Sequence, residues 1–512
     1  MATIQMKVRP EDLSQVPKSA ERIPEPGILV IFGASGDLTK RKLLPALFHL
    51  RQANLLPKQF AIVGVARRPL GDEFAADMRE GIVEFGAADA SDPKLDEFLS
   101  HISYFPLKFD DPSNYAGLKA ELERIDREKG IAGNRLFYLA TAPEFFAGII
   151  ENLGAQGMAN PEKGVAEIVI EKPFGHDLAS ARTLSDELHC AFEESEVYRI
   201  DHYLGKETVQ NILAFRFGNG IFEPLWNRRY VNHVQITAAE SIGVENRGAY
   251  YQEAGALRDM IQNHLSQVLA TIAMEPSATF RPTSVRDERS KLLRSIRVMK
   301  PDEVLQNTVS GQYGPAHIGG EDVPGFRQEQ GVKPDAQTDT YAAITFFVDN
   351  WRWAGVPFYL RSGKRLPKRV TEIAIQFNAA PLAIFNGDET TTAPNLLILR
   401  IQPEEGISLK FLSKRPGAGM KLRPVSMDFN YGSSFGERSP SAYETLLLDA
   451  IIGDATLYTR QDMVEASWAV VDAIQHVWDE TTFDFPNYAS GTWGPKASDD
   501  MLARRGHVWR QP

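Results

Sequence analysis

The chain has 512 residues, of which 43% are hydrophobic and 24% charged, and its formal net charge is −11 at pH 7. One hydrophobic core rarely spans this length, so we expect two sizeable domains. The negative charge gives no support for binding to nucleic acid, and an anionic ligand would need local cations.

Residues 1–26 are rich in proline, glutamate and basic residues and lack the apolar run of a secretory signal, so we expect an N-terminal tail. No uninterrupted apolar stretch is long enough to span a bilayer, which predicts no membrane partner. The lone cysteine, Cys190, forms no internal disulfide and excludes a zinc site built on thiolates. We therefore expect a cytoplasmic protein without a metal site.

Residues 27–200 alternate short apolar runs with helix-length amphipathic segments. This pattern predicts an α/β domain of Rossmann type, with a parallel sheet and crossover helices. The runs are Ile28–Phe32, Phe60–Val65, Ile102–Phe105, Leu136–Leu139 and Ile168–Ile170.

Residues 201–512 have a different texture. Apolar residues alternate with polar ones, as at Val234, Ile236 and Ala238, which predicts a mainly antiparallel sheet. Long helical patterns at Arg247–Met274 and Met463–Val477 make this larger domain α+β. Glu321–Asp339, with many Gly, Pro, Gln and Asp residues, is predicted to be a surface loop.

A candidate nucleotide-binding turn follows the first predicted strand. Glycines there would let backbone N–H groups approach a pyrophosphate at a helix N-terminus. Ser35 and Leu38 stand where the G-x-G-x-x-G pattern has glycines, so a purely structural tight turn is the alternative. The turn comprises Gly33, Ala34, Ser35, Gly36, Asp37 and Leu38.

Arg67 and Arg68 end the second predicted strand, where an NAD enzyme usually has an acidic residue for the ribose 2′-hydroxyl. Two arginines would instead attract a 2′-phosphate, which favours NADP and leaves NAD as a weaker alternative. On their own they could equally be solvated surface charges.

Charged side chains that could bind an anionic substrate gather near the predicted domain boundary. Lys172 follows a strand at the carboxyl edge of the sheet, where open α/β folds bind ligands. His202 and Lys206 are four residues apart and would share one face of a helix. Each of these could otherwise be an ordinary surface residue.

A second group lies further along the chain. His264 stands at the edge of an apolar stripe, a position typical of a packed core histidine, and Asp259 lies about 140° away on an ideal helix. The two would not stack, although they could flank one ligand. The basic residues between Arg361 and Arg369 could form an anion site or a solvated loop.

Taken together, these segments resemble the glucose-6-phosphate dehydrogenase family from Gly27 onward. The most specific run is Arg-Ile-Asp-His-Tyr-Leu-Gly-Lys-Glu, which begins at Arg199. Glu-Lys-Pro-Phe-Gly, Gly-Ala-Ser-Gly-Asp-Leu, Arg-Asp-Met-Ile-Gln-Asn-His-Leu and Tyr-Ala-Ser-Gly-Thr-Trp-Gly-Pro occur in the family's order.

The resemblance implies oxidation of glucose 6-phosphate to 6-phosphogluconolactone with hydride transfer to NADP, the first step of the pentose phosphate route. It implies that His264 is the general base, oriented by Asp201, and that Arg67 binds the 2′-phosphate. The implied substrate-binding residues are Lys172, which also lies near the nicotinamide, His202, Tyr203, Lys206, Glu240, Asp259, Lys364 and Arg369.

Two other functions remain open at this point. A different sugar oxidoreductase could share the Rossmann half and the Glu-Lys-Pro motif, and a sensor or scaffold could bind NADP without turnover. A binder needs no general base, so His264, Asp201 and Lys172 argue against the second. The resemblance further implies a homodimer or homotetramer packed through the large sheet.

Overall fold

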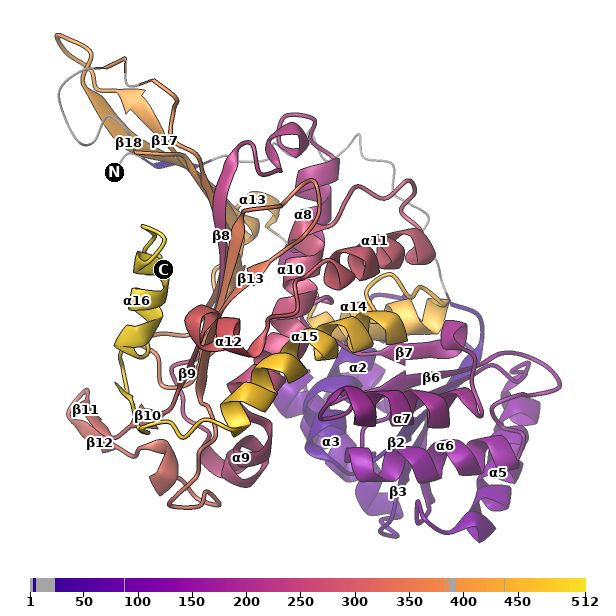
Figure 1. The fold of residues 1–512 in the computed structure, drawn as a ribbon. Helices are drawn as coiled ribbons and strands as arrows, with labels where there is room; N and C mark the ends of the chain where they lie inside the picture. Colours follow the sequence, from indigo (N-terminus) through magenta and orange to yellow (C-terminus); the bar gives the residue numbers. More distant parts are fainter. Residues whose placement is uncertain (1–2, 6–23, 87, 383, 386–392, 437) are drawn as a thin grey trace.

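The computed structural model of the protein describes residues 3–5, 24–86, 88–382, 384–385, 393–436 and 438–512. It contains the two predicted domains, a parallel α/β domain and a larger α+β domain (Figure 1). Most of the expected N-terminal tail lies outside the described residues. None of the helices in the described part of the chain is long and apolar enough to cross a membrane.

The first domain contains a six-stranded parallel sheet with strand order β4-β3-β2-β5-β6-β7. Its strands are β2 (Gly27–Phe32), β3 (Phe60–Ala66), β4 (Ile102–Pro106), β5 (Arg135–Leu139), β6 (Ala166–Ile170) and β7 (Val197–Arg199). The five predicted strands are confirmed. The sixth, β7, was missed because its three residues form too short an apolar run.

Helices connect these strands and cover the sheet. They are α2 (Leu44–Gln52), α3 (Asp72–Gly86), α4 (Pro93–Leu99), α5 (Tyr115–Lys129), α6 (Phe146–Ala155) and α7 (Leu178–His189), with the 3₁₀ turns η2 (Pro112–Asn114), η3 (Pro143–Phe145) and η4 (Glu194–Glu196). Successive residues of β2 enter opposite cores: Leu29 and Ile31 pack on one side, and Ile28, Val30 and Phe32 on the other. Both faces are therefore buried, which is why the sequence shows a continuous apolar run.

The larger domain is built on a nine-stranded sheet with strand order β1-β18-β17-β16-β15-β8-β14-β13-β9. Its strands are β1 (Thr3–Gln5), β8 (Val231–Ala239), β9 (Thr308–Gly311), β13 (Tyr341–Phe347), β14 (Pro357–Gly363), β15 (Val370–Phe377), β16 (Leu396–Gln402), β17 (Gly406–Lys414) and β18 (Leu422–Asn430). Neighbouring strands are antiparallel except β8 with β14 and β1 with β18. The predicted, mainly antiparallel sheet is confirmed, and β17 and β18 extend beyond the rest of the molecule (Figure 1).

The helices of this domain are α8 (Glu207–Phe217), α9 (Gly248–Ala256), η7 (Leu257–Leu265), α10 (Ser266–Ala273), α11 (Pro282–Arg294), α12 (Pro301–Asn307), α13 (Tyr431–Phe435), α14 (Ala442–Ile452), α15 (Gln461–Asp479) and α16 (Lys496–Ala503). The smaller elements are the strand pairs β10 (Tyr313–Gly314) with β19 (Tyr488–Ala489) and β11 (Ala316–Ile318) with β12 (Glu321–Val323), and the turns η5 (Glu223–Leu225), η6 (Glu245–Arg247) and η8 (Phe326–Gln328).

The second predicted helical pattern, Met463–Val477, lies within α15, whereas Arg247–Met274 is three segments. The break comes at Gly255, whose φ is +65°. A Cβ on Gly255 would lie 2.3 Å from Oδ1 of Asp339, so this close approach requires glycine. The chain then winds as a π-helix through η7.

The predicted surface loop Glu321–Asp339 is wrong in part. It contributes the strand β12 and the 3₁₀ turn η8, and Phe326 and Asp339 are buried. Phe326 packs edge-on against Tyr251 and Tyr313, and Asp339 accepts a hydrogen bond from the Leu257 N–H at 2.8 Å. The polar composition of the segment did not reveal these contacts.

The chain returns to the first domain near its C-terminus. Helix α14 packs on α2, and α15 packs on both α7 and η7 (Figure 1). One continuous apolar core therefore contains residues from both domains, including Leu47 of α2, Leu265 of η7 and Leu446 of α14. The junction so formed holds the candidate site.

Candidate active site

The candidate nucleotide turn lies at the carboxyl end of β2, where β3 and β5 flank this strand. Gly33 has φ +85°, and a Cβ there would lie 2.3 Å from the carbonyl oxygen of Ala140. The Gly36 N–H donates to the Gly33 carbonyl at 2.9 Å, and a π-helix, η1 (Thr39–Leu43), continues into α2. The turn thus lies where strand order reverses, the usual ligand crevice of open α/β sheets.

Arg67 and Arg68 directly follow β3 at the same sheet edge, and both are exposed. The Arg67 guanidinium lies 5.1 Å from the centre of the Phe145 ring. No carboxylate forms an ion pair with either arginine among the residues that the structure describes. Their charges are therefore free to attract an anion.

Lys172, which follows β6, contacts η7 from the opposite domain. Its Nζ lies 3.1 Å from Oδ1 of Asp259 and 2.9 Å from Nε2 of His264. Asp259 and His264 both face the Lys172 ammonium, because a π-helix bonds residue i to residue i+5 and so brings residues five apart to one side. The 140° separation expected for an ideal α-helix is wrong here for that reason.

His264 and Asp201 form a buried pair. Nδ1 of His264 lies 2.6 Å from Oδ1 of Asp201, and both side chains are at most 3% exposed. The same carboxylate oxygen accepts a hydrogen bond from the Tyr203 N–H at 2.9 Å. Nδ1 of the neutral imidazole therefore donates to the carboxylate, and its Nε2 is left as the acceptor that faces Lys172.

The electrostatics of this pair follow from burial and neighbouring charge. Burial lowers the pKa of His264, although Asp201 acts to raise it. Burial alone would raise the pKa of Asp201, but His264 and His202 hold it at about 2. The imidazole is thus neutral and the carboxylate ionised near neutral pH, which is the state in which a histidine can accept a proton.

Residues 202–206 form turns, and α8 begins only at Glu207, so the helix considered for His202 and Lys206 is wrong. The turns nevertheless bring the predicted residues together. The Tyr203 ring stacks on His264 with centroids 4.6 Å apart, and His202 meets His264 edge-on at 4.5 Å. Nζ of Lys206 lies 3.7 Å from the Tyr203 ring centre.

Gln402, which the sequence did not indicate, completes this group. Its Oε1 accepts a hydrogen bond from Nζ of Lys206 at 2.7 Å, and its Nε2 donates to Thr371 at 3.1 Å. Burial lowers the pKa of Lys206 to about 8, and nearby Arg369 acts in the same direction. Gln402 ends β16 far along the chain, so no local spacing pointed to it.

Glu240 and Lys364 pair with each other at the ends of β8 and β14, which are neighbours in the sheet. Burial would raise the pKa of Asp259, but Lys172, His264 and Lys364 lower it to about 2. Lys364 therefore lies near enough to Asp259, the partner of Lys172, to lower the pKa of its carboxyl.

The basic stretch that begins in β14 and continues beyond it contains both buried and exposed residues. Arg361 is fully buried and donates to Thr237 at 3.0 Å and to the Arg510 carbonyl at 2.6 Å, and Arg365 pairs with Glu329. These two arginines are structural. Arg369 is exposed and lies near Lys206.

Glu171 directly precedes Lys172 and was not predicted as a site residue. Its carboxylate accepts hydrogen bonds from Tyr138 of β5 at 2.6 Å and from Tyr443 of α14 at 3.2 Å. Burial raises the pKa of Glu171. This buried contact fixes the backbone before Lys172 to both domains.

Metal-ligand atom types do occur in the cluster: those of Asp201, His202 and His264 lie within 4.8 Å of one another. A cation that His264 bound through Nδ1 together with Asp201 and His202 would have to replace the proton between His264 and Asp201. The 2.6 Å separation fits the hydrogen bond better.

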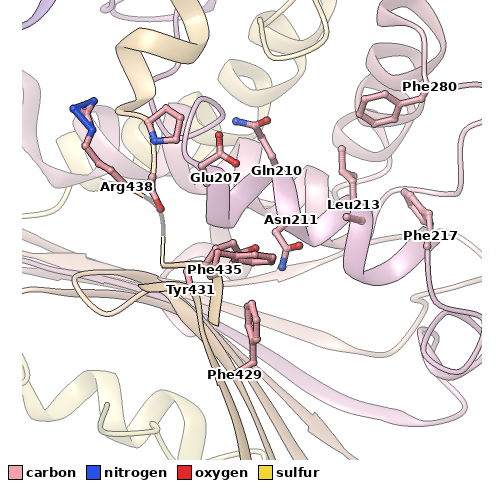
Figure 2. A pocket seen from close by; sticks show the side chains of 14 residues that line it. Glu207, Gln210, Asn211, Leu213, Phe217, Phe280, Phe429, Tyr431, Phe435 and Arg438 are labelled. Carbon is pink, nitrogen blue, oxygen red and sulfur yellow. The ribbon is translucent and has the colours of Figure 1, made fainter. Parts of the chain in front are cut away.

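A separate cavity of about 670 Å³ lies against α8, between this helix and the end of β18 (Figure 2). Five aromatic rings line it: Phe217, Phe280, Phe429, Tyr431 and Phe435. It contains none of the predicted site residues. A smaller cavity of about 40 Å³ borders Lys172 and Asp201.

The structure thus combines a glycine turn at the carboxyl end of β2, in a Rossmann-like sheet, with a buried carboxylate–histidine pair where this domain meets the second one. This combination defines a dinucleotide-dependent oxidoreductase. The family described as "Glucose-6-phosphate dehydrogenase, NAD binding domain" matches residues 30–211, and its "C-terminal domain" matches residues 213–510.

Curated relatives named glucose-6-phosphate 1-dehydrogenase agree. That of Aggregatibacter actinomycetemcomitans is 47% identical over 94% of this chain and 97% of its own length, and that of Bacillus subtilis is 44% identical over 94% and 98%. A solved glucose-6-phosphate dehydrogenase in complex with glucose 6-phosphate is 36% identical, with a TM-score of 0.86 over 96% of this chain and 99% of that one. The chain belongs to the glucose-6-phosphate dehydrogenase family.

Proposed function

We propose that this protein oxidises glucose 6-phosphate at C1 to 6-phosphogluconolactone and reduces NADP, the first step of the oxidative pentose phosphate route. The observation that carries the proposal is the array of Lys172, His264 and Asp201. It offers a neutral base, its orienting carboxylate and a cation at one point between the two domains.

The residues at the end of β2 fit a dinucleotide. A Cβ on Gly33 would clash with the Ala140 carbonyl oxygen at 2.3 Å, so only glycine allows this tight turn, whose backbone N–H groups can approach a pyrophosphate. We assign the pyrophosphate to residues 33–38, the 2′-phosphate to Arg67 and the nicotinamide side to Lys172. When bound, the nicotinamide supplies the acceptor for the hydride from C1.

His264 is the proposed general base. Its Nε2 takes the proton of the C1 hydroxyl as the C1 hydrogen leaves as hydride, so that C1 becomes the lactone carbonyl. The imidazolium that forms is stabilised by Asp201, whose carboxylate is held ionised. In this geometry the substrate hydroxyl takes over the contact that Lys172 now makes with Nε2, while Asp259 retains the ammonium.

The sugar phosphate is assigned to the turns before α8. His202, Tyr203 and Lys206 lie together, and the ammonium of Lys206 can form a charge-assisted hydrogen bond to the phosphate. Arg369 adds positive charge at the edge of this group. Glu240, Asp259 and Lys364 are assigned to the sugar hydroxyls.

The decisive experiment is to follow the absorbance of reduced nicotinamide with glucose 6-phosphate and NADP, beside NAD and unphosphorylated glucose. We expect rapid reduction that needs both phosphates. His264→Asn should lower kcat by about 10²–10⁴-fold and leave KM within about tenfold. The matched control is His476→Asn, because His476 is exposed, with 74% of its side chain accessible. Normal turnover by His264→Asn would refute the assignment.

The choice of NADP rests on Arg67. Arg67→Ala should raise KM for NADP by at least about tenfold, the effect of one charge-assisted bond, and change KM for NAD little. Equal effects on both nucleotides would contradict NADP selectivity but not the dehydrogenase activity.

We further propose that residues 27–200 bind the nucleotide and that residues 201–512 bind the sugar phosphate and form a homodimer or homotetramer through the large sheet. Light scattering coupled to gel filtration tests the assembly, and a monomer at micromolar concentration would contradict it. The single, free Cys190 suits a reducing compartment, and we propose the cytoplasm.

A further inference from the structure

Arg67 lacks the carboxylate partner that usually orients an arginine. Its side chain is exposed, and no ion pair holds it among the described residues. A free arginine side chain samples many rotamers and loses that freedom on binding a phosphate. An arginine that is held in place beforehand binds more tightly.

The Phe145 ring supplies such a hold. The guanidinium carbon of Arg67 lies 5.1 Å from the ring centre. Stacking uses the face of the guanidinium and leaves the N–H groups at its edge free for a phosphate. Phe145 ends η3, in the loop after β5, so it reaches Arg67 from the strand on the far side of β2.

Phe145 is itself anchored beneath the nucleotide turn. It packs edge-to-face on Phe109 at 5.5 Å, and Phe109 packs in the same way on Phe32 at 6.0 Å. Phe32 is the last residue of β2 and directly precedes Gly33. The three rings therefore join the pyrophosphate turn to the arginine.

The backbone of the Arg67 turn is fixed independently. The single O–H proton of Tyr104, on β4, is shared between the carbonyl oxygens of Arg68 and, at 3.3 Å, Ala66. These contacts place the main chain on either side of Arg67 and leave the direction of its side chain to Phe145.

We propose that Phe145 is a positioning residue that determines selectivity for nucleotides with a ribose 2′-phosphate. It acts through Arg67 by holding the guanidinium over the end of β2. The inference rests on the proposed use of NADP and extends it, since it assigns part of the selectivity to a residue that carries no charge.

The test compares two probes, 2′,5′-ADP and 5′-AMP, in calorimetric binding to the whole protein. They share adenine, ribose and 5′-phosphate and differ in the 2′-phosphate. Phe145→Leu should weaken 2′,5′-ADP by about three- to tenfold and leave 5′-AMP within twofold. KM for NADP should rise equally, with kcat unchanged. Phe145→Tyr keeps the ring, so its affinity for 2′,5′-ADP and its KM for NADP should equal those of the parent.

Phe347→Leu is the matched control. Phe347 also lies under an arginine, Arg297, at 5.4 Å, but belongs to β13 of the other domain. It should leave both probes unchanged. Thermal unfolding of each variant checks that the fold is kept.

Three results would overturn the inference. Phe145→Leu could weaken both probes equally, which would make the ring an adenine contact or a fold contact, or it could weaken neither. The third is an undiminished effect of Phe145→Leu in an Arg67→Ala background. If Arg67→Ala itself changes neither probe, the proposed NADP selectivity fails first. If it weakens only 2′,5′-ADP while Phe145→Leu does nothing, only this inference fails.

Discussion

Asp201→Asn removes one charge from the proposed base pair and keeps its shape. The amide oxygen can still accept the hydrogen bond that Nδ1 of His264 makes at 2.6 Å. What disappears is the negative charge that stabilises the imidazolium in a site where both partners are almost completely buried. The variant therefore isolates electrostatic stabilisation from positioning.

The expected loss follows from this geometry. A hydrogen bond to a charged group contributes about 1.5–3 kcal/mol, and each 1.36 kcal/mol corresponds to about tenfold in rate. We therefore expect kcat/KM to fall about 10- to 150-fold, mostly in kcat, because the charge on His264 develops only in the transition state.

The pH profile gives a second, signed expectation. The base must be unprotonated, so activity rises as pH passes the pKa of His264. Asp201 raises this pKa and Lys172 lowers it. The acid limb of kcat should therefore move to lower pH in Asp201→Asn and to higher pH in Lys172→Met.

The assay is steady-state reduction of NADP between pH 5 and 9, with Asp500→Asn as a surface control of the same chemistry. Unfolding temperatures must stay comparable, because Asp201 also accepts the Tyr203 N–H. A kcat/KM within twofold of the parent, or an acid limb that moves to higher pH in Asp201→Asn, would refute the proposed pair.

Three further predictions concern neighbouring residues. Burial lowers the pKa of Lys206 to about 8, so at pH values above 8 the KM for glucose 6-phosphate should increase, by up to about tenfold. Lys206→Arg should remove this increase, because arginine stays charged. An equal increase in the variant would contradict the phosphate assignment. Gly255→Ala should lower the free energy of unfolding by about 1–3 kcal/mol, because of its positive φ and its contact with Asp339, and an unchanged melting temperature would show that the turn relaxes. Burial raises the pKa of Asp339 to about 7, so the stability that this carboxyl contributes is present below its unfolded pKa and is lost as pH rises toward 7. Relative to the parent, the free energy of unfolding of Asp339→Asn should therefore rise by about 2 kcal/mol between pH 5 and 7. Denaturant unfolding curves that show the same difference between variant and parent at every pH would exclude this titration.

The sequence predicted the parts of the fold that local periodicity encodes. The buried strands of the first domain appear as apolar runs because both of their faces are covered, and alternation marked the strands of the larger sheet. The turn at Gly33 and the arginines after β3 were found because each directly follows such a strand. Family motifs then indicated His264, Asp201 and Lys172 together.

Contacts between residues far apart in the sequence could not be predicted from local patterns. The π winding of η7, which turns Asp259 and His264 toward Lys172, has no counterpart in an ideal helical pattern. Gln402 and Tyr443 reach the site from elements roughly two hundred residues or more away from their partners. Arg361 looked like part of an anion site, but its burial beneath the C-terminal residues depends entirely on tertiary packing.

The return of α14 and α15 to the first domain has a consequence during synthesis. At about 5–20 residues per second, the segment from β7 to the end of α15 takes on the order of tens of seconds to be made. Until then the surfaces of α2 and α7 that these helices cover are open to solvent. The nascent nucleotide-binding half therefore emerges from the ribosome with an uncovered apolar side, and it completes its core only when the last part of the chain arrives.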